Sequence, residues 1–129
     1  MQAALSCLVL TGLFLLGSTA WAKNACVFEG NLQGVPIKDC SEIDLQVPPA
    51  EYKQQCEQNE KAFKEMGGQI HAYVVPACPK PAQASCAGAM GSPGTVYYYL
   101  VSPQDLEKKK ASCLKYQGKW QAGMSEPAK

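Results

Sequence analysis

The sequence predicts a small α+β domain in which two helices pack on a small antiparallel sheet. Two segments have helical spacing with clear start and stop signals, and each is followed directly by a strand-like segment. A third segment, residues 95–101, lies between these two units and is rich in β-forming residues. Cysteines spread along the chain predict that disulfides hold the domain together.

The first 22 residues predict a secretory signal peptide. Residues 3–17 form an uncharged, leucine-rich run, and Ala20-Trp21-Ala22 is a small-x-small cleavage site. The run is shorter than the about 20 apolar residues that a membrane span needs. We therefore expect cleavage near Ala22 and an extracytoplasmic location, either periplasmic or secreted. The mature chain, residues 23–129, is expected to be a single cysteine-rich domain without a membrane span.

Cleavage would remove Cys7 and leave an even number of cysteines. The mature chain contains Cys26, Cys40, Cys56, Cys78, Cys86 and Cys113. Many pairings of these six are compatible with the sequence. We expect local closures Cys26–Cys40 and Cys78–Cys86, with Cys56–Cys113 joining the two helices. The single histidine and the lack of a Cys-x2-Cys pair predict no metal site.

The first half is expected to contain a strand at residues 25–29, a helix and a second strand. The helix, residues 51–66, starts after two prolines and stops at Gly67-Gly68. The residues predicted to form its buried face are Tyr52, Cys56, Phe63 and Met66. Residues 69–75 are the following strand. Residues 23–49 are predicted to be a largely irregular N-terminal arm, because glycines and prolines interrupt them.

The second half is expected to contain the strand at residues 95–101, a helix that ends near Gly118 and a strand at residues 119–123. Ser102 and Asp105 form an S-x-x-D capping box at the helix start. The residues predicted to face inward are Leu106, Cys113 and Leu114. Residues 124–129 are expected to be a disordered tail.

The predicted order is therefore strand, helix, strand, strand, helix, strand. This βαββαβ order is that of a split βαβ sandwich. The halves also resemble each other, since Pro49-Ala-Glu-Tyr and Pro103-Gln-Asp-Leu stand at the two helix starts, each followed by a cysteine, a glycine and a strand. A three-stranded α+β sheet with an irregular N-terminal arm is the alternative.

The charge pattern argues against a nucleic-acid partner. The formal net charge is +1, and the sequence contains no arginine. The only basic cluster is Lys108-Lys109-Lys110, which would fan around a helix axis. We interpret this cluster as a solvated helix face.

Residues 79–85 would form a rigid loop if Cys78 and Cys86 were paired. A preformed loop of this kind reduces the ordering cost of binding, so Lys80 is a candidate contact residue for an inhibitor-like recognition loop. Pro81 directly after Lys80 does not suit a trypsin-like protease. A stapled connector is the favoured interpretation.

Four aromatic residues are candidates for a binding surface. Strand alternation places His71 and Tyr73 on one face, which Tyr97 and Tyr99 would extend if their strand had the same orientation. Such a surface could stack a sugar, a peptide or an aromatic ligand. The favoured interpretation is an ordinary half-buried strand with tyrosine hydroxyls that reach water.

The sequence thus predicts a monomeric binding or interaction protein, inhibitor-like or an envelope component, with no cofactor. Its ligand would be a protein, a peptide or a small molecule. The alternative is a small extracytoplasmic hydrolase in which His71 acts with a carboxylate. The motifs G-x-S-x-G, H-E-x-x-H and Cys-x-x-Cys do not occur in the sequence.

Overall fold

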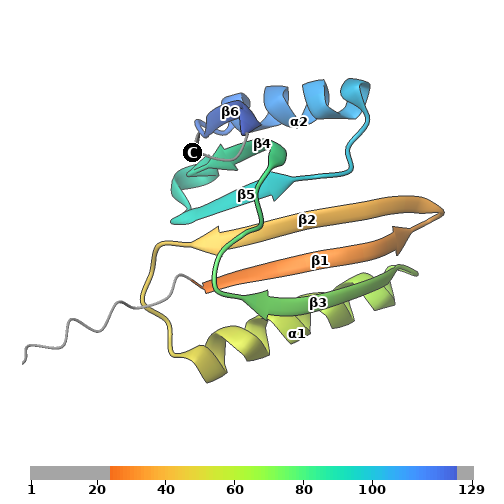
Figure 1. Ribbon diagram of the computed structural model, residues 1–129, viewed down its shortest axis with the longest axis vertical. Helices are drawn as coiled ribbons and strands as arrows, with labels where there is room; N and C mark the ends of the chain where they lie inside the picture. Colours follow the sequence, from red (N-terminus) through yellow and green to blue (C-terminus); the bar gives the residue numbers. More distant parts are fainter. Residues whose placement is uncertain (1–23, 125–129) are drawn as a thin grey trace, which may run out of the picture.

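The computed structural model describes residues 24–124 as an α+β domain (Figure 1). The domain contains a six-stranded antiparallel sheet, two α-helices and three disulfides, which confirms the predicted fold class. The predicted signal peptide, residues 1–22, lies outside the described residues. So does the predicted tail, apart from Met124 at the end of the last strand.

The elements follow one another in two similar units. The first unit consists of β1 (Asn24–Leu32), β2 (Val35–Ile43), α1 (Pro49–Glu65) and β3 (Gln69–Val75). The second consists of β4 (Ala82–Ala87), the short 3-10 helix η1 (Ala89–Gly91), β5 (Gly94–Tyr98), α2 (Pro103–Lys115) and β6 (Lys119–Met124). In each unit, two paired strands precede a helix, and the strand after the helix pairs with the first strand.

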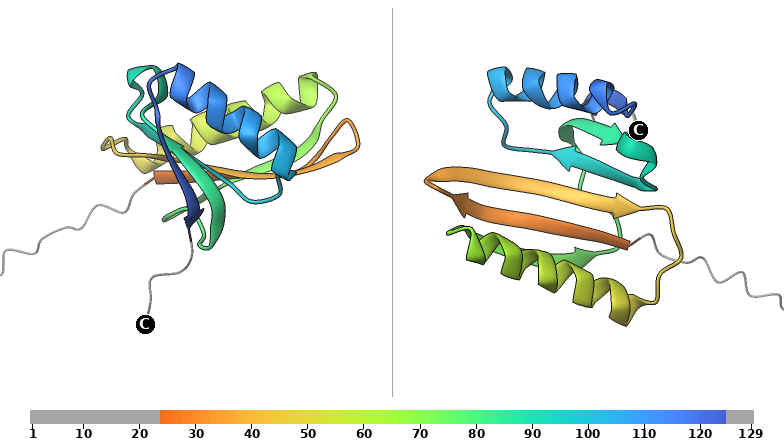
Figure 2. Two further views of the ribbon diagram at one scale, coloured as in Figure 1. Left: turned by 90° about the horizontal axis from the view of Figure 1, so that it is seen from above. Right: turned by 180° about the vertical axis from the view of Figure 1, so that it is seen from behind.

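The two units join edge to edge in one sheet. Its strand order is β3-β1-β2-β5-β4-β6, so β2 and β5 meet in the centre. Both helices lie on the same face of the sheet, α1 over one end and α2 over the other (Figure 2). The similarity between the two helix starts in the sequence therefore corresponds to two structurally equivalent helices.

The irregular arm predicted for residues 23–49 is wrong over most of its length, because β1 and β2 form a hairpin there. Gln33 and Gly34 form its two-residue turn with φ of 51° and 81°, as a type I′ turn requires. Pro36 precedes Asp39, where the pairing of β2 with β5 begins. Pro36 is paired with Asn31 of β1, but the other side of β2 has no partner strand at this position, and a proline is tolerated where one side of a strand is open. The glycine and proline that suggested irregular structure are thus compatible with the hairpin.

The predicted element order also lacked β4. This strand begins at Ala82, within the segment expected to form a stapled loop, and pairs with both β5 and β6. Its sequence, AQASCA, has little intrinsic β propensity. Ala84 and Ser85 are nevertheless buried, so the two neighbouring strands determine the conformation of β4.

The predicted disulfide pairing is wrong. The bonds are Cys26–Cys56, Cys40–Cys78 and Cys86–Cys113. In the hairpin, Cys26 lies opposite Ser41 rather than Cys40. Because side chains alternate between faces, Cys26 points toward α1 while Cys40 points to the other face. A Cys26–Cys40 bond is therefore incompatible with this register.

Residues 76–81 connect the two units, and we call them the strap. The strap crosses the sheet face opposite the helices (Figure 1). Cys78 in the strap is bonded to Cys40, and its backbone N–H donates a hydrogen bond of 2.9 Å to the buried Glu42 carboxylate. A core forms on this face between strap and sheet, consisting of Ala25, Val27, Cys40, Cys78, Ala82 and Tyr97. The strap thus gives the sheet a second buried face.

Tyr99 holds the strap at a second point, which leads to a prediction for alkaline pH. Its hydroxyl donates a hydrogen bond of 2.7 Å to the Pro79 carbonyl. Burial, and secondarily the neighbouring Tyr97, raises the pKa of Tyr99 to about 12. The folded state therefore holds this proton more tightly than the unfolded state, in which the pKa is about 10. The resulting stabilisation is complete below pH ~10 and is lost as the pH rises to ~12.

We expect Tyr99→Phe to lower the free energy of unfolding by about 1 kcal/mol at pH 8, because one hydrogen bond is lost. The variant should also lose less stability than the wild type between pH 8 and pH 11 in urea unfolding experiments. Tyr116→Phe, at a tyrosine that is 45% exposed, is the matched control. Parallel alkaline losses in the wild type and in Tyr99→Phe would contradict the expectation.

The helix boundaries follow the signals seen in the sequence. Gly67, with φ of 82°, ends α1, and the Gly68 N–H donates to the Phe63 carbonyl at 2.9 Å, as in a Schellman motif. Ser102 caps α2 by accepting a 3.2 Å hydrogen bond from the Asp105 N–H. Neither helix within residues 24–124 is long and apolar enough to span a membrane.

The faces of the helices were predicted only in part. Tyr52, Cys56 and Cys113 are buried as expected. Met66 and Leu114, expected to face inward, are 59% and 53% exposed. Met66 lies beyond the last turn of α1. In α2, the disulfide of Cys113 turns that residue toward the sheet, and Leu114 follows it about 100° further around the axis.

Candidate functional site

The two helices cover the ends of the sheet and leave its centre open on the helix side. Helix α1 packs on β1 and β3 and is bonded to β1 by Cys26–Cys56. Helix α2 packs on β6 and is bonded to β4 by Cys86–Cys113. The central strands β2 and β5 lie between the helices in both the front and back views (Figures 1 and 2). They are therefore the floor of the space beside α2.

Two adjoining hollows lie along α2 above this floor, and together we call them the α2 groove. The first has a volume of about 770 Å³ and lies between the start of β2, residues 99–102 and the first turns of α2. The second has a volume of about 420 Å³ and lies between β5, η1 and the end of α2. Lys109 lines both hollows. Its half-buried side chain thus marks the point where they meet.

Exposed apolar side chains gather along the α2 groove. Val35 and Leu100, which line the first hollow, are 60% and 56% exposed. Met90 and Tyr116, which line the second, are 78% and 45% exposed. Apolar walls with a few convergent polar groups are typical of ligand sites, and contiguous exposed apolar surface often marks an interaction site.

Two charged side chains, Asp39 and Lys109, lie near the centre of the groove. Asp39 on β2 pairs across the strands with Tyr98 on β5. Burial raises the pKa of Asp39, while the positive charge of Lys109 acts in the opposite direction. The Lys109 Nζ atom lies 4.8 Å from the centroid of the Tyr98 ring, within cation–π range. On the same ring, Trp120 stacks at a centroid distance of 5.9 Å.

The remaining charges of the first hollow already have partners. Asp105 accepts hydrogen bonds of 3.0 Å from Lys108 and from the Ser102 hydroxyl. The hydrogen bond from Lys108 is the main cause that lowers the pKa of Asp105, and the hydrogen bond from Ser102 is the next. Lys38 lies over the ring of Tyr99, with its Nζ atom 5.6 Å from the centroid. Asp39 and Lys109 are thus the charges best placed to meet a ligand.

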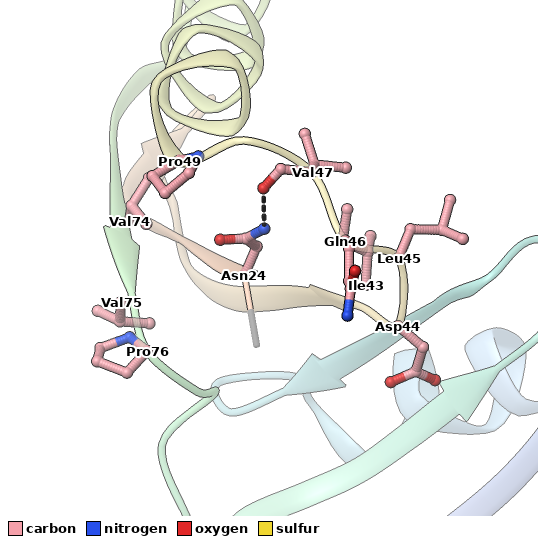
Figure 3. Close-up of a pocket in the computed structure, with 10 residues that line it drawn as sticks. All are labelled: Asn24, Ile43, Asp44, Leu45, Gln46, Val47, Pro49, Val74, Val75 and Pro76. Atoms are coloured by element: carbon pink, nitrogen blue, oxygen red, sulfur yellow. Dashed lines mark hydrogen bonds between the residues drawn. The ribbon is translucent and has the colours of Figure 1, made fainter. Parts of the chain in front are cut away.

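A third hollow, of about 560 Å³, lies between the β2–α1 connection and the end of β3 (Figure 3). Its walls are mostly apolar and include Ile43, Val47 and Val74. The Asn24 side chain donates a 3.0 Å hydrogen bond to the Val47 carbonyl across it. Asn24 is the first residue that the structure describes.

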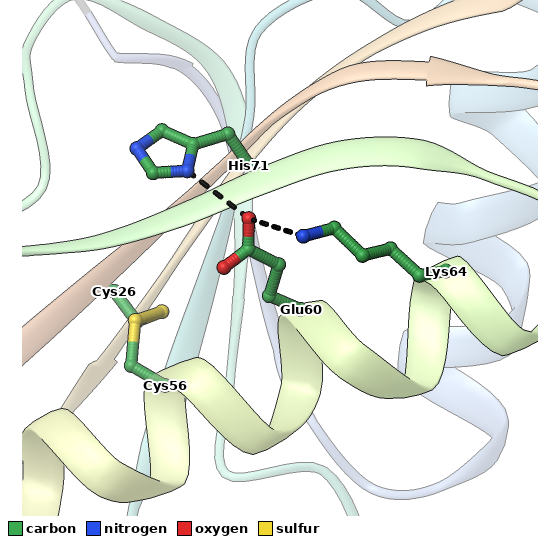
Figure 4. Close-up of polar contacts among 5 residues, drawn as sticks. All are labelled: Cys26, Cys56, Glu60, Lys64 and His71. Carbon is green, nitrogen blue, oxygen red and sulfur yellow. Dashed lines mark hydrogen bonds and ion pairs between the residues drawn. A yellow bond between two sulfur atoms is a disulfide. The ribbon is translucent and has the colours of Figure 1, made fainter.

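His71, the first predicted site residue, lies on the edge strand β3. Its Nδ1 atom is 3.1 Å from the Glu60 carboxylate, which Lys64 also contacts at 3.4 Å (Figure 4). The hydrogen bond from His71 lowers the pKa of Glu60. The His71 ring also stacks on Tyr73 at 5.4 Å. His71 therefore has the carboxylate partner that the hydrolase alternative requires, but its side chain is 70% exposed.

The predicted aromatic surface is divided. The strand register places His71, Tyr73, Tyr97 and Tyr99 on the same sheet face, opposite the helices. Tyr97, however, is 8% exposed beneath the strap, and the Tyr99 hydroxyl is bonded to the strap. His71 and Tyr73 are exposed at the edge of the sheet, whereas Tyr99 is half-buried beside the strap. Lys80 is exposed on the strap itself, not on a loop closed by Cys78 and Cys86.

Comparisons with protein-family models, curated proteins and solved structures gave no match. The site therefore rests on its own geometry. Sequence reasoning missed Asp39, which lies in the segment expected to be irregular, and Lys109, which was interpreted as part of a solvated face. Lys108 and Lys110 are indeed exposed, but Lys109 faces the sheet. The alternation of Val35 and Ile37 with Pro36 and Lys38 was the local signal of β2, and it covers only the start of the strand.

Proposed function

We propose that this protein is a small exported binding protein and that the α2 groove is its ligand site. Three disulfides in a domain of this size are typical of oxidising, extracytoplasmic compartments. The predicted signal peptide supports export to such a compartment. The disulfides keep the framework rigid, which lowers the ordering cost of binding.

The open centre of the helix side of the sheet carries this proposal. A sheet face that serves only stability is expected to be covered with apolar contacts. In this protein the strap covers a core on one face, whereas the other face is left open beside α2, where it presents exposed apolar side chains around a half-buried charge. Apolar walls with a small number of polar or charged groups that set orientation, here Asp39 and Lys109, are the usual composition of a small-molecule site.

The test is a fragment screen by NMR on the oxidised, ¹⁵N-labelled domain. The library contains neutral, cationic and anionic fragments, and we expect the shift changes to cluster at Ile37, Tyr98 and Lys109. Leu100→Glu should weaken the binding of apolar fragments about fivefold or more, because it places a charge in the groove.

Leu114→Glu is the matched control, since Leu114 has nearly the same exposure as Leu100 but lies outside both hollows. It should leave fragment binding unchanged. Shift changes that gather instead around His71 or around the hollow of Figure 3, or a library without any groove binder, would contradict the proposal.

A further inference from the structure

Within residues 24–124, the Asp39 carboxylate has no counter-charge in direct contact, although the charge of Lys109 acts on it. Among the residues that the structure describes, its side chain makes no hydrogen bond and no ion pair. It is nevertheless half-buried on the floor of the groove. A partly desolvated carboxylate without a contact partner is costly and favours the approach of a cation.

Tyr98 supplies the second half of a cation site. Its ring lies on the neighbouring strand in register with Asp39, and its face already attracts the Lys109 ammonium group. Burial raises the pKa of the Tyr98 phenol, and the negative charge of Asp39 is the second cause. The two groups therefore interact electrostatically. A carboxylate beside an aromatic face is an arrangement suited to ammonium ions.

We propose that the α2 groove binds a small organic amine, with its ammonium group between Asp39 and the Tyr98 ring and its apolar chain along Ile37 and Leu100. This inference rests on the proposed binding function. Lys109 lies over the ring of Tyr98 and would swing out when the amine enters. An anionic ligand is disfavoured, because any group that reached Lys109 would also approach Asp39.

Three probes with the same apolar chain test the charge preference: n-hexylammonium, 1-hexanol and n-hexanoate. Their binding is measured by NMR titration of the oxidised protein. Hexylammonium should bind more tightly than hexanol, and hexanoate should bind most weakly. Tighter binding of hexanoate than of hexylammonium would overturn the inference.

Two variants test the residues. Asp39→Asn keeps the side-chain shape and should weaken hexylammonium binding at least about tenfold, because the charge that holds the ammonium group is removed. Asp105→Asn is the matched control in the same hollow. It should change the affinity less than about twofold, since Asp105 is already paired with Lys108 at the surface. Equal effects of the two variants would overturn the inference.

Lys109→Met gives an independent result of opposite sign. It removes the competing cation while keeping an apolar chain, so hexylammonium should bind more tightly than to the wild type. This variant also decides the outcome if Asp39→Asn does not fold, because weaker binding to Lys109→Met would contradict displacement of Lys109.

If neutral or anionic fragments bind in the groove but hexylammonium does not, the amine inference fails and the proposed binding function stands. If no fragment binds there, both fail.

Discussion

Replacing Cys40 and Cys78 together by alanine is expected to lower the free energy of unfolding by about 5 kcal/mol. The bond closes a sequence separation of 38 residues, for which loop-closure entropy accounts for about 4 kcal/mol. Release of the strap adds about 1 kcal/mol or more, because Val27 and other buried apolar side chains gain access to water. Alanine is preferred to serine, since a hydroxyl at the fully buried position 40 would itself be destabilising.

The matched control is the double replacement of Cys86 and Cys113 by alanine. Its sequence separation is 27 residues, so the two loop entropies differ by only about 0.3 kcal/mol. Urea unfolding gives the loss of unfolding free energy in each variant. If the Cys40/Cys78 variant loses more than the control by clearly over ~0.3 kcal/mol, the excess is the contribution of the strap. Equal losses would mean that the strap contributes little beyond its crosslink. Sodium sulfate, added equally to both, keeps the weaker variant measurable.

Gly30→Ala is expected to lower the free energy of unfolding by about 3 kcal/mol. Gly30 lies within β1 at a φ of 149°, a region that residues with a Cβ atom rarely adopt. A Cβ atom at this position would overlap the backbone carbonyl of Gln69 on β3 and lie 3.1 Å from the Ile70 Cα atom. Backbone atoms cannot move aside as a flexible side chain can, so the pairing of β1 with β3 must shift.

Gly34→Ala separates the steric effect from the backbone strain. Gly34 also has a positive φ, 81°, but no atom lies within 4 Å of the position that an added Cβ atom would take in the turn. We expect this control to lose only about 1 kcal/mol. Urea unfolding gives the two values, and amide hydrogen exchange along β3 should be faster in Gly30→Ala alone. Similar losses in both variants would contradict the proposed backbone clash.

The sequence predicted the elements whose signals are local. Helix α1 begins at a pair of prolines, Pro48 and Pro49, and is followed by two glycines, and α2 begins with a capping box, so both were located to within a few residues. Strands β3, β5 and β6 were recognised from their composition or from their place after a helix. These signals depend on neighbours in the sequence and need no knowledge of the tertiary structure.

The missing elements depend on distant contacts. Strand β4 consists largely of small residues and is extended because β5 and β6 flank it. The partner of Cys40 depends on the path of the strap, and the local rule that nearby cysteines pair gave the wrong bonds. Register decides which face a cysteine occupies, and register between strands is not visible in the local pattern.

Of the residues considered for a site, the sequence correctly arranged only two that lie outside the α2 groove. Alternation correctly placed His71 and Tyr73 on one face of a strand. It could not reveal that the strap buries Tyr97, nor that the Cys86–Cys113 bond orients α2 so that Lys109 faces the sheet. The α2 groove arises from the space left between two units, which no single segment of the sequence encodes.

The order of the cysteines along the chain has a consequence for oxidative maturation. Counted from Cys26, the bonds join the first cysteine to the third, the second to the fourth and the fifth to the sixth. An oxidant that joined neighbouring thiols as they were synthesised would produce Cys26–Cys40 and would have to be followed by thiol–disulfide exchange. The second unit needs no such correction, because its two cysteines are consecutive. Dependence on a disulfide isomerase should therefore reside in the first unit and the strap, which hold the four cysteines of these two bonds.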